Sequence, residues 1–424
     1  MLALFKQNKQ FRILLMYQVF SGLGGGVFSL FMLLSVHLIY QNPIYTGIAG
    51  FLMTAPHVFA LAVGPVVDRR NKVSIMRITT LLEFAVLALL VAVPFQDSLG
   101  VGFMFAVILI YAMAALFEAP AGTALLPQIV EEDEIMQANS LMQIASLAGG
   151  IIIAVFLFGV LGAENMENFR LIYGMSAVFL ALAFIFGLFL KNPDATQEAK
   201  AKPNYWDDLK GGFNFLRQTV LLFILIMIVA RAFFAEIAYI NMPMFAETHV
   251  GAQGYVLITV MGLIGGILAS SLVSAFGDKI KVGQLIFLMS LLGGLARIAF
   301  ALTLPNSYIG GLAIVIVYST LLNAYGIIIR SLIQKIPPKD MVGRIDTLTT
   351  TFAAISITIG ALAGGFIGSI IPVVDYIFIF HGVTIAIIGS LTLLVPSMRA
   401  LPRMNDIKTD DAKEMTTAKE QDNA

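Results

Sequence analysis

Long apolar stretches alternate with short polar stretches along almost the whole chain. A helix that crosses a bilayer needs about 20 mostly apolar residues. Twelve segments meet this requirement, which predicts twelve transmembrane helices over residues 13–39, 44–66, 73–95, 99–127, 136–161, 168–190, 219–246, 251–276, 282–304, 308–336, 341–371 and 373–396. Membrane-spanning strands are not expected, because they alternate apolar and polar positions over only about 10 residues. The predicted fold class is therefore an all-α membrane protein.

Composition supports a membrane protein and excludes several other classes. Of the 424 residues, 58% are hydrophobic and 12% are charged, which is about half the charged fraction of an ordinary soluble domain. A soluble protein could not bury so much apolar surface. The 26 basic and 26 acidic residues cancel, so no net field attracts nucleic acid. The absence of cysteine removes disulfides and thiolate metal sites.

Basic residues gather in alternate loops and predict the orientation. Loops rich in Lys and Arg face the cytoplasm, and here they follow the second, sixth, eighth and tenth predicted helices. The opposite loops contain no Lys or Arg except Arg170, at the edge of a helix. Both termini are therefore expected in the cytoplasm, with the protein in the plasma (inner) membrane. The short basic N-terminus runs straight into the first apolar segment, so that segment is expected to be retained rather than cleaved.

A polar linker over residues 191–218 divides the predicted helices six and six. Within it, Trp206, Leu209, Phe213 and Leu216 recur near helical spacing. This spacing predicts a short amphipathic helix on the inner membrane surface, with the single tryptophan as an interfacial anchor. The predicted organisation is an N-terminal six-helix half (1–190), this cytoplasmic linker, a C-terminal six-helix half (219–396) and a disordered cytoplasmic tail (397–424).

Two sequence matches indicate that the halves are repeats. Residues 64–73 (GPVVDRRNKV) parallel 274–282 (SAFGDKIKV) at an offset of 210. Residues 130–141 (VEEDEIMQANSL) parallel 337–348 (PPKDMVGRIDTL) at an offset of 207. Two matches at nearly one offset predict two parallel six-helix halves, which is the arrangement of one large group of transporters.

On these residues the chain resembles the major facilitator superfamily over essentially all twelve predicted helices. The segment GPVVDRRNK is similar to a loop signature of that superfamily at Gly64, Asp68, Arg69 and Lys72, although Arg70 replaces the usual glycine. The stretches PAGTALLPQIVEEDEIMQANSLMQ and QKIPPKDMVGRIDTL are similar to its bacterial macrolide-efflux and siderophore-export branch. The resemblance implies that two halves expose one central site to each side of the membrane in turn.

The resemblance also implies a gating latch in the loop that carries Asp68. Its carboxylate would accept hydrogen bonds from the N-terminus of a facing helix, near residues 341–344. Gly64 would allow close backbone approach. Arg69 and Lys72 would meet lipid phosphates or carboxylates, or would only set the topology. Asp278 is the weaker counterpart in the second half.

Ionisable residues inside the predicted helices need a function or a partner, because insertion of a charge costs at least about 2.5 kcal/mol. In the resembled fold the first, fourth, seventh and tenth helices line the cavity. Glu118, Arg231 and Glu236 lie on such helices and are candidates for proton coupling or substrate binding. Glu83 and Arg297 lie on supporting helices and are expected to be structural. The secondary candidates for the cavity are Tyr239, Asn241, Asn323 and Tyr325, and the lone histidines are expected to pack.

Glu118 is the acidic candidate with the clearest position. It lies nine residues before Pro127, roughly 13 Å inside the cytoplasmic end of its helix. Burial at that depth disfavours the charged form, so this carboxyl could exchange a proton near neutral pH and couple transport to proton entry. The alternative is a structural carboxyl that a neighbouring helix satisfies, for example through Arg330. Arg231 and Glu236 are five residues apart and point about 140° away from each other, so a simple pair is not expected.

The leading functional hypothesis is a secondary active transporter that exports amphipathic small molecules, drug-like or macrolide-like, against proton entry. The chain shows no P-loop and no HExxH or GxSxG motif, so neither an ATP-driven pump nor an enzyme is expected. Two departures weigh against an ordinary drug antiporter: the fifth helix has no Gly-Pro pair, and Glu118 stands where an arginine is common. The alternatives are a carrier of an anionic or lipid-like substrate, with Arg231 and Arg297 as ligands, and a non-transporting membrane sensor.

The expected driving force is the proton gradient, with no cofactor and no metal. The expected partners are a small-molecule substrate and membrane lipid, without nucleic acid, and the chain is expected to act as a monomer.

Overall fold

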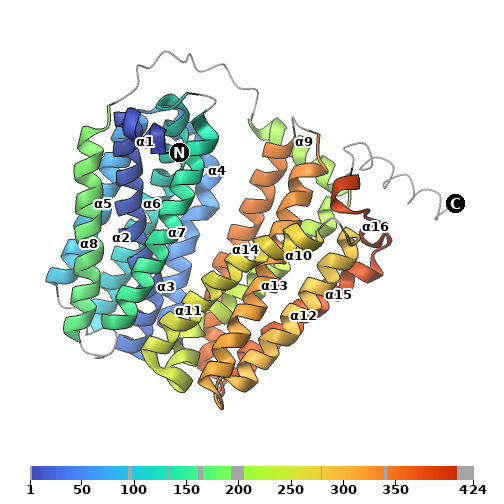
Figure 1. Ribbon diagram of the computed structural model, residues 1–424. Coiled ribbons are helices and arrows are strands. Elements are labelled where there is room, and N and C mark those ends of the chain that lie inside the picture. Colours follow the sequence, from blue (N-terminus) through green and yellow to red (C-terminus); the bar gives the residue numbers. More distant parts are fainter. Residues whose placement is uncertain are drawn as a thin grey trace. The chain divides into compact units, whose positions relative to one another are not determined.

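Figure 1 shows the computed structural model, which describes residues 2–93, 98–131, 134–160, 166–191, 205–277, 279–338 and 341–407. Within these ranges the chain is helical throughout and has no strand. It forms two compact units, residues 1–200 (unit 1) and 201–424 (unit 2).

Unit 1 contains eight α-helices and, among its described residues, the two short 3-10 helices η1 and η2 (Leu126–Gln128). Asparagine side chains begin three of the helices: Asn8, Asn42 and Asn71 accept hydrogen bonds from backbone N–H groups of the first turn, as favoured N-cap residues do. The helices are α1 (Leu2–Gln7), α2 (Lys9–Tyr40), α3 (Pro43–Thr54), η1 (Ala55–Phe59), α4 (Ala60–Arg69), α5 (Lys72–Ala92), α6 (Ser98–Leu125), α7 (Ile135–Val160) and α8 (Met166–Phe189).

Unit 2 begins inside the predicted linker 191–218, at residue 201. The residues expected to form an amphipathic helix do form one, α9, although the side chains of residues 205–209, including Trp206, lie outside the described part. The helices are α9 (Tyr205–Gln218), α10 (Leu221–Ile240), α11 (Met242–Phe276), α12 (Val282–Thr303), α13 (Tyr308–Lys335), α14 (Val342–Ile370), α15 (Asp375–Leu394) and the short α16 (Pro396–Arg399).

Ten of the described helices are long and apolar enough to cross a membrane: α2, α5, α6, α8 and α10 to α15. The protein is therefore a multi-pass, all-helical membrane protein, and the count of twelve helices remains a prediction. The second predicted segment, 44–66, is divided among α3, η1 and α4. The break falls at Pro56, which lacks the N–H that a continuing helix requires. The fifth predicted segment coincides with α7, which is not among the ten.

Backbone breaks also occur near the junction of the seventh and eighth predicted segments. α10 ends at Ile240, and α11 resumes at Met242 with Pro243 in its first turn. Gly251 then interrupts α11 with φ 72° and ψ 178°, a conformation that glycine adopts without steric penalty. α11 consequently consists of two helical segments, 242–250 and 252–276.

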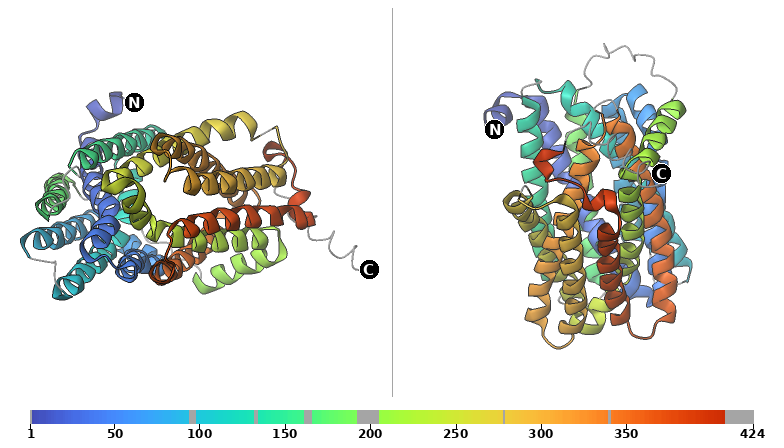
Figure 2. Two further views of the ribbon diagram at one scale, coloured as in Figure 1. Left: turned by 90° about the horizontal axis from the view of Figure 1, so that it is seen from below. Right: turned by 90° about the vertical axis from the view of Figure 1, so that its right-hand side faces the viewer.

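The two units pack their helices in the same pairs. In unit 1, α2 packs on α7 and α8, and α5 packs on α6 and α8. In unit 2, α10 packs on α14 and α15, and α12 packs on α13 and α15, so α12 and α15 lie side by side (Figures 1 and 2). The repeated offset in the sequence thus has a counterpart in the packing within each unit.

Glycines allow the closest of these helix contacts. A Cβ atom at Gly294 would lie 2.5 Å from the carbonyl oxygen of Gly382, where α12 meets α15. A Cβ atom at Gly265 would lie 2.6 Å from the Cβ of Ser319, where α11 meets α13. Small residues at these points let the helix backbones approach, as they do in many membrane proteins.

Candidate functional site

A polar cluster surrounds Glu118 inside unit 1. Tyr17 and Ser21 lie one turn apart on the same face of α2, and both hydroxyls donate to Oε1 of Glu118 on α6, at 2.8 and 2.6 Å. The Tyr17 hydroxyl also contacts the hydroxyl of Thr80 on α5, which donates to the carbonyl oxygen of Met76 at 2.8 Å. Glu118 is half-buried. Within the described part of unit 1, its hydrogen-bond partners are these two hydroxyls. No Lys, Arg or His of that part forms an ion pair with it.

A second carboxyl group belongs to this cluster. Glu83 is 1% exposed and lies one turn after Thr80 on the same face of α5, the face that contacts Tyr17, a hydrogen-bond partner of Glu118. Neither of its carboxyl oxygens has a hydrogen-bond partner among the described residues. Tyr111 is buried on α6, two turns before Glu118. The structure therefore brings Glu83, assigned to a supporting helix, next to the acidic candidate Glu118.

Two arginines in unit 2 lie over aromatic rings of α13. The guanidinium carbon of Arg231 lies 3.8 Å from the ring centroid of Tyr325, and Nη2 donates to the carbonyl oxygen of Leu322 at 3.4 Å. Arg297 is 4% exposed, and its guanidinium carbon lies 4.6 Å from the ring centroid of Tyr318 and 4.8 Å from that of Phe378. Such cation–π contacts stabilise a desolvated guanidinium by about 2 kcal/mol.

The remaining candidates on α10 have three different environments. Glu236 is half-buried against α14 and makes no hydrogen bond or ion pair among the described residues. Tyr239 is 44% exposed. Asn241 is 1% exposed and donates from Nδ2 to the carbonyl oxygens of Ile237 and Gly364, at 2.8 and 2.9 Å. Its amide thus connects α10 to α14.

Asn323 is exposed on α13. Its Nδ2 donates to the carbonyl oxygen of Ser319 at 2.8 Å, one turn earlier on the same helix. It therefore presents its remaining polar atoms away from the packed core of unit 2.

The predicted latch residues fall largely outside the described side chains. The backbone of Gly64, Asp68 and Arg69 belongs to α4, but their side chains lie outside the described part of the chain. Asp278 also lies outside it. Lys72 is the first residue of α5, directly after the N-cap residue Asn71.

The two units place different chemistry at repeat-related positions. Tyr111 and Glu118 on α6 correspond to Tyr318 and Tyr325 on α13 at the offset of 207, since 318 − 111 and 325 − 118 both equal 207. Glu118 meets Tyr17 of α2, whereas Tyr325 meets Arg231 of α10. Unit 1 therefore carries acidic groups where unit 2 carries a cation over an aromatic ring. This relation follows directly from the repeat offset in the sequence.

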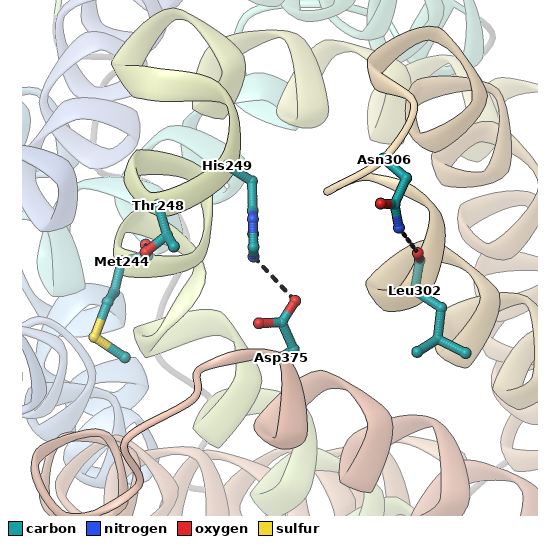
Figure 3. Close-up of polar contacts among 6 residues, drawn as sticks. All are labelled: Met244, Thr248, His249, Leu302, Asn306 and Asp375. Carbon is teal, nitrogen blue, oxygen red and sulfur yellow. Dashed lines mark hydrogen bonds and ion pairs between the residues drawn. The ribbon is translucent and has the colours of Figure 1, made fainter.

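An ion pair within unit 2 involves residues that the sequence did not single out. Nε2 of His249 lies 2.9 Å from Oδ1 of Asp375 in the first turn of α15 (Figure 3). His249 precedes the break at Gly251 by two residues, and its ring also contacts Phe245 at 4.8 Å. This contact ties the first segment of α11 to the start of α15.

Within the described residues, no group of three or more potential metal ligands gathers.

Comparison with known proteins establishes the family. Residues 14–361 match the Major Facilitator Superfamily. The chain belongs to this superfamily.

Relatives and solved structures place this superfamily member among transporters. It is 25% identical to macrolide efflux protein A of Enterococcus faecalis over 330 residues, which cover 74% of this chain and 97% of that protein. It is 25% identical to the Streptococcus pyogenes protein of the same name over 382 residues, which cover 87% and 88% of the two chains.

Solved structures share the fold at low sequence identity. A nucleoside transporter superposes with a TM-score of 0.72 at 13% identity, covering 90% of this chain and 99% of the other. A bacterial homologue of the iron transporter ferroportin gives 0.70 at 12% identity, with coverage of 90% and 97%. Membership of the superfamily makes the protein a secondary transporter, in agreement with its macrolide efflux relatives.

Proposed function

We propose that the protein exports amphipathic small molecules, macrolide-like compounds among them, in exchange for protons across the bacterial plasma membrane. The macrolide efflux proteins that it resembles over most of its length support this substrate class. Proton exchange needs a carboxyl group inside the membrane that is neither locked to a cation nor removed from water.

The surroundings of the Glu118 carboxyl group are the observation that supports this proposal. Its carboxyl group is half-buried within α6 and is held by two hydroxyl groups of α2. A hydroxyl can donate to a carboxylate and also accept from a carboxylic acid, so the same partners accommodate both protonation states. A lysine or arginine partner would instead favour the charged state alone. Glu118 can therefore gain and lose a proton without rearrangement of the helices around it.

Glu236 is the second acidic candidate for the same role, in unit 2. It is half-buried and makes no ion pair among the described residues. Unlike Glu118, it lacks hydroxyl donors, which would leave its charged form without stabilising partners. Glu118 is therefore the stronger candidate.

Alternating access completes the proposal. The two units would act as the two halves of the carrier, with Asp68 of α4 as the latch of the cytoplasmic gate and both termini in the cytoplasm. A single chain would be the functional unit.

Transport in proteoliposomes tests this function. Purified protein is reconstituted, vesicles are loaded with a macrolide or a fluorescent amphipathic amine, and flux is recorded with and without an imposed pH gradient. The proposal expects substrate movement toward the acidic side, and dissipation of the gradient should reduce it at least tenfold. Flux that is equal with and without the gradient would refute proton coupling, and absence of flux for every amphipathic compound would refute the substrate class.

A carrier of anionic substrates is the second candidate function, and one observation favours it. Arg231 is half-buried over Tyr325, and its Nη1 atom has no hydrogen-bond partner among the described residues. A carboxylate or phosphate could occupy that donor. Transport of a labelled anionic amphiphile separates the candidates: the protein should carry it if Arg231 binds substrate, and should not if Glu118 does.

A further inference from the structure

Glu83 occupies an extreme position for an ionisable residue. It lies in the middle of α5, is 1% exposed, and neither carboxyl oxygen has a hydrogen-bond partner among the described residues. A carboxylate buried without donors is strongly disfavoured, whereas a carboxylic acid carries no charge to compensate. The surroundings of Glu83 therefore suit a neutral acid.

Glu118, beside it, has the opposite surroundings. Its Oε1 atom accepts hydrogen bonds from both Tyr17 and Ser21, at 2.8 and 2.6 Å. Donors of this kind stabilise a negative charge. The two neighbouring carboxyl groups thus differ in their hydrogen-bond donors. Glu118 has the donors that a carboxylate needs, and Glu83 has none among the described residues.

No described cation offsets a second negative charge in this cluster. The nearest arginine on α5, Arg77, uses its guanidinium on α8: Nε donates to the carbonyl oxygen of Gly187 at 2.8 Å and Nη2 to that of Leu190 at 2.7 Å. Two carboxyl groups close together in a poorly solvated place do not both carry a charge.

The other helices packed around the cluster carry their charged residues near helix ends or on side chains outside the described part. On α2 these are Lys9 and Arg12 in its first turn and His37 in its last turn. On α8 the charged residue is Arg170, which is exposed at the start of the helix. On α3 and η1, which pack on α6, the titratable residues are Tyr45 and the exposed His57. On α4 the charged residues are Asp68 and Arg69, whose side chains lie outside the described part.

We propose that Glu83 and Glu118 form a carboxyl pair that shares one proton, with Glu83 as the neutral acid and Glu118 as the carboxylate. Once protonated, Glu83 supplies the O–H donor that Oε2 of Glu118 lacks among the described residues, so Glu83 is a positioning residue. Entry of a second proton converts the Glu118 carboxylate to an acid and leaves the pair uncharged. The role of this second proton in transport rests on the proposed function, while the shared proton itself does not.

Infrared spectroscopy tests the shared proton without any transport. The carbonyl stretching band of a carboxylic acid is recorded at neutral pH for the full chain in lipid nanodiscs. Wild type, Glu118→Gln and the control Glu236→Gln should all show the band component assigned to Glu83, and Glu83→Gln should lack it. Should Glu83→Gln fail to fold, Glu83→Asp should move the component to a different frequency. A spectrum of Glu83→Gln or Glu83→Asp identical to that of wild type would overturn the proposal.

Transport of a fluorescent amphipathic amine tests the positioning role. Glu83→Gln keeps an N–H donor toward Glu118 and should remain within about twofold of wild type in flux driven by the pH gradient. Glu83→Leu has similar volume but no donor, and should lose about tenfold, which is the effect of one lost hydrogen bond to a charged group. Equal flux in the two variants would refute the positioning role. If the Glu83 band is found but wild type shows no proton-driven flux, the shared proton stands and the proposed function fails.

Discussion

Hydroxyl donors distinguish Glu118 from the other acidic residues at the scale of single residues. Tyr17→Phe removes one of its two donors but preserves the ring in the core of unit 1. A hydrogen bond to a charged group contributes about 1.5–3 kcal/mol, so transport driven by a pH gradient should fall about tenfold or more. Initial rates of amine flux in proteoliposomes measure this. Tyr376→Phe, at a site 59% exposed, is the matched control and should leave the rate unchanged.

Arg297 shows how a buried charge can have a packing role. Three rings surround its guanidinium at 4.6 to 5.3 Å, and no described carboxylate pairs with it. Replacement of a buried ion by an apolar side chain of similar volume is often tolerated. The free energy of unfolding of Arg297→Met should therefore lie within about 1 kcal/mol of that of wild type, and the variant should keep its substrate profile. Loss of flux for an anionic amphiphile alone in this variant would instead support the anion-carrier function.

Close helix contacts determine stability at the scale of elements. A Cβ atom at Gly294 would lie 2.5 Å from the carbonyl oxygen of Gly382, and backbone cannot move aside easily. Gly294→Ala should separate α12 from α15 and lower the stability of unit 2 by about 1–3 kcal/mol, as overpacking does. Thermal unfolding in detergent measures the loss. Gly326→Ala is the control, since no atom lies within 4 Å of its Cβ position and alanine favours a helix. Similar unfolding temperatures for the two variants would contradict this account.

The sequence predicted helices well where an apolar run was continuous and predicted breaks poorly inside such runs. The prediction of 282–304 matches α12 (Val282–Thr303) because polar loops flank the run on both sides. By contrast, the predicted helix 44–66 is broken at Pro56, where apolar residues continue on both sides of the proline. The same holds at Asn241 and Pro243, between α10 and α11. Hydropathy measures the length of the apolar segment, whereas a missing backbone donor decides where the helix breaks.

The pairing of Glu83 with Glu118 shows the limit of the sequence for the site. Assignment of residues to cavity or supporting helices treats each helix as one surface. α5 instead carries Glu83 on the same face as Thr80, whose hydroxyl contacts Tyr17, a hydrogen-bond partner of Glu118. Only tertiary packing determines which faces of α5 and α6 meet. The tyrosines at the offset of 207 were within reach of the sequence, because they follow directly from the repeat.

Orientation belongs to the scale of the whole molecule, and the chain suits a labelling test because it contains no cysteine. Single cysteines introduced at Asn42 and Pro305 should react with an impermeant reagent from outside intact cells, because their loops lack Lys and Arg. A cysteine at Thr196, in the basic linker, should react only after the membrane is opened. External labelling at Thr196 would contradict an even number of crossings before the linker.

The latch hypothesis also concerns the whole molecule. Asp68→Asn keeps the size of the side chain and removes its charge, so the variant should fold and insert while flux falls strongly. Val66, exposed on the same helix, provides the control Val66→Ala, which should transport like wild type. Full transport by Asp68→Asn would show that the latch of the resembled loop does not operate in this protein.

The central claim is that Glu118 carries the exchanged proton, and one measurement on Glu118→Gln tests it most directly. Glutamine resembles the protonated acid in shape and keeps polar contact with Tyr17 and Ser21, so the variant should express and bind substrate. In proteoliposomes it should exchange labelled for unlabelled amine at a rate within about threefold of wild type, as expected when binding is kept. Under an imposed pH gradient and without internal substrate, the net flux of amine through this variant should fall to the level of protein-free vesicles. If Glu118→Gln responds to the gradient like wild type, the account of proton coupling through Glu118 is wrong.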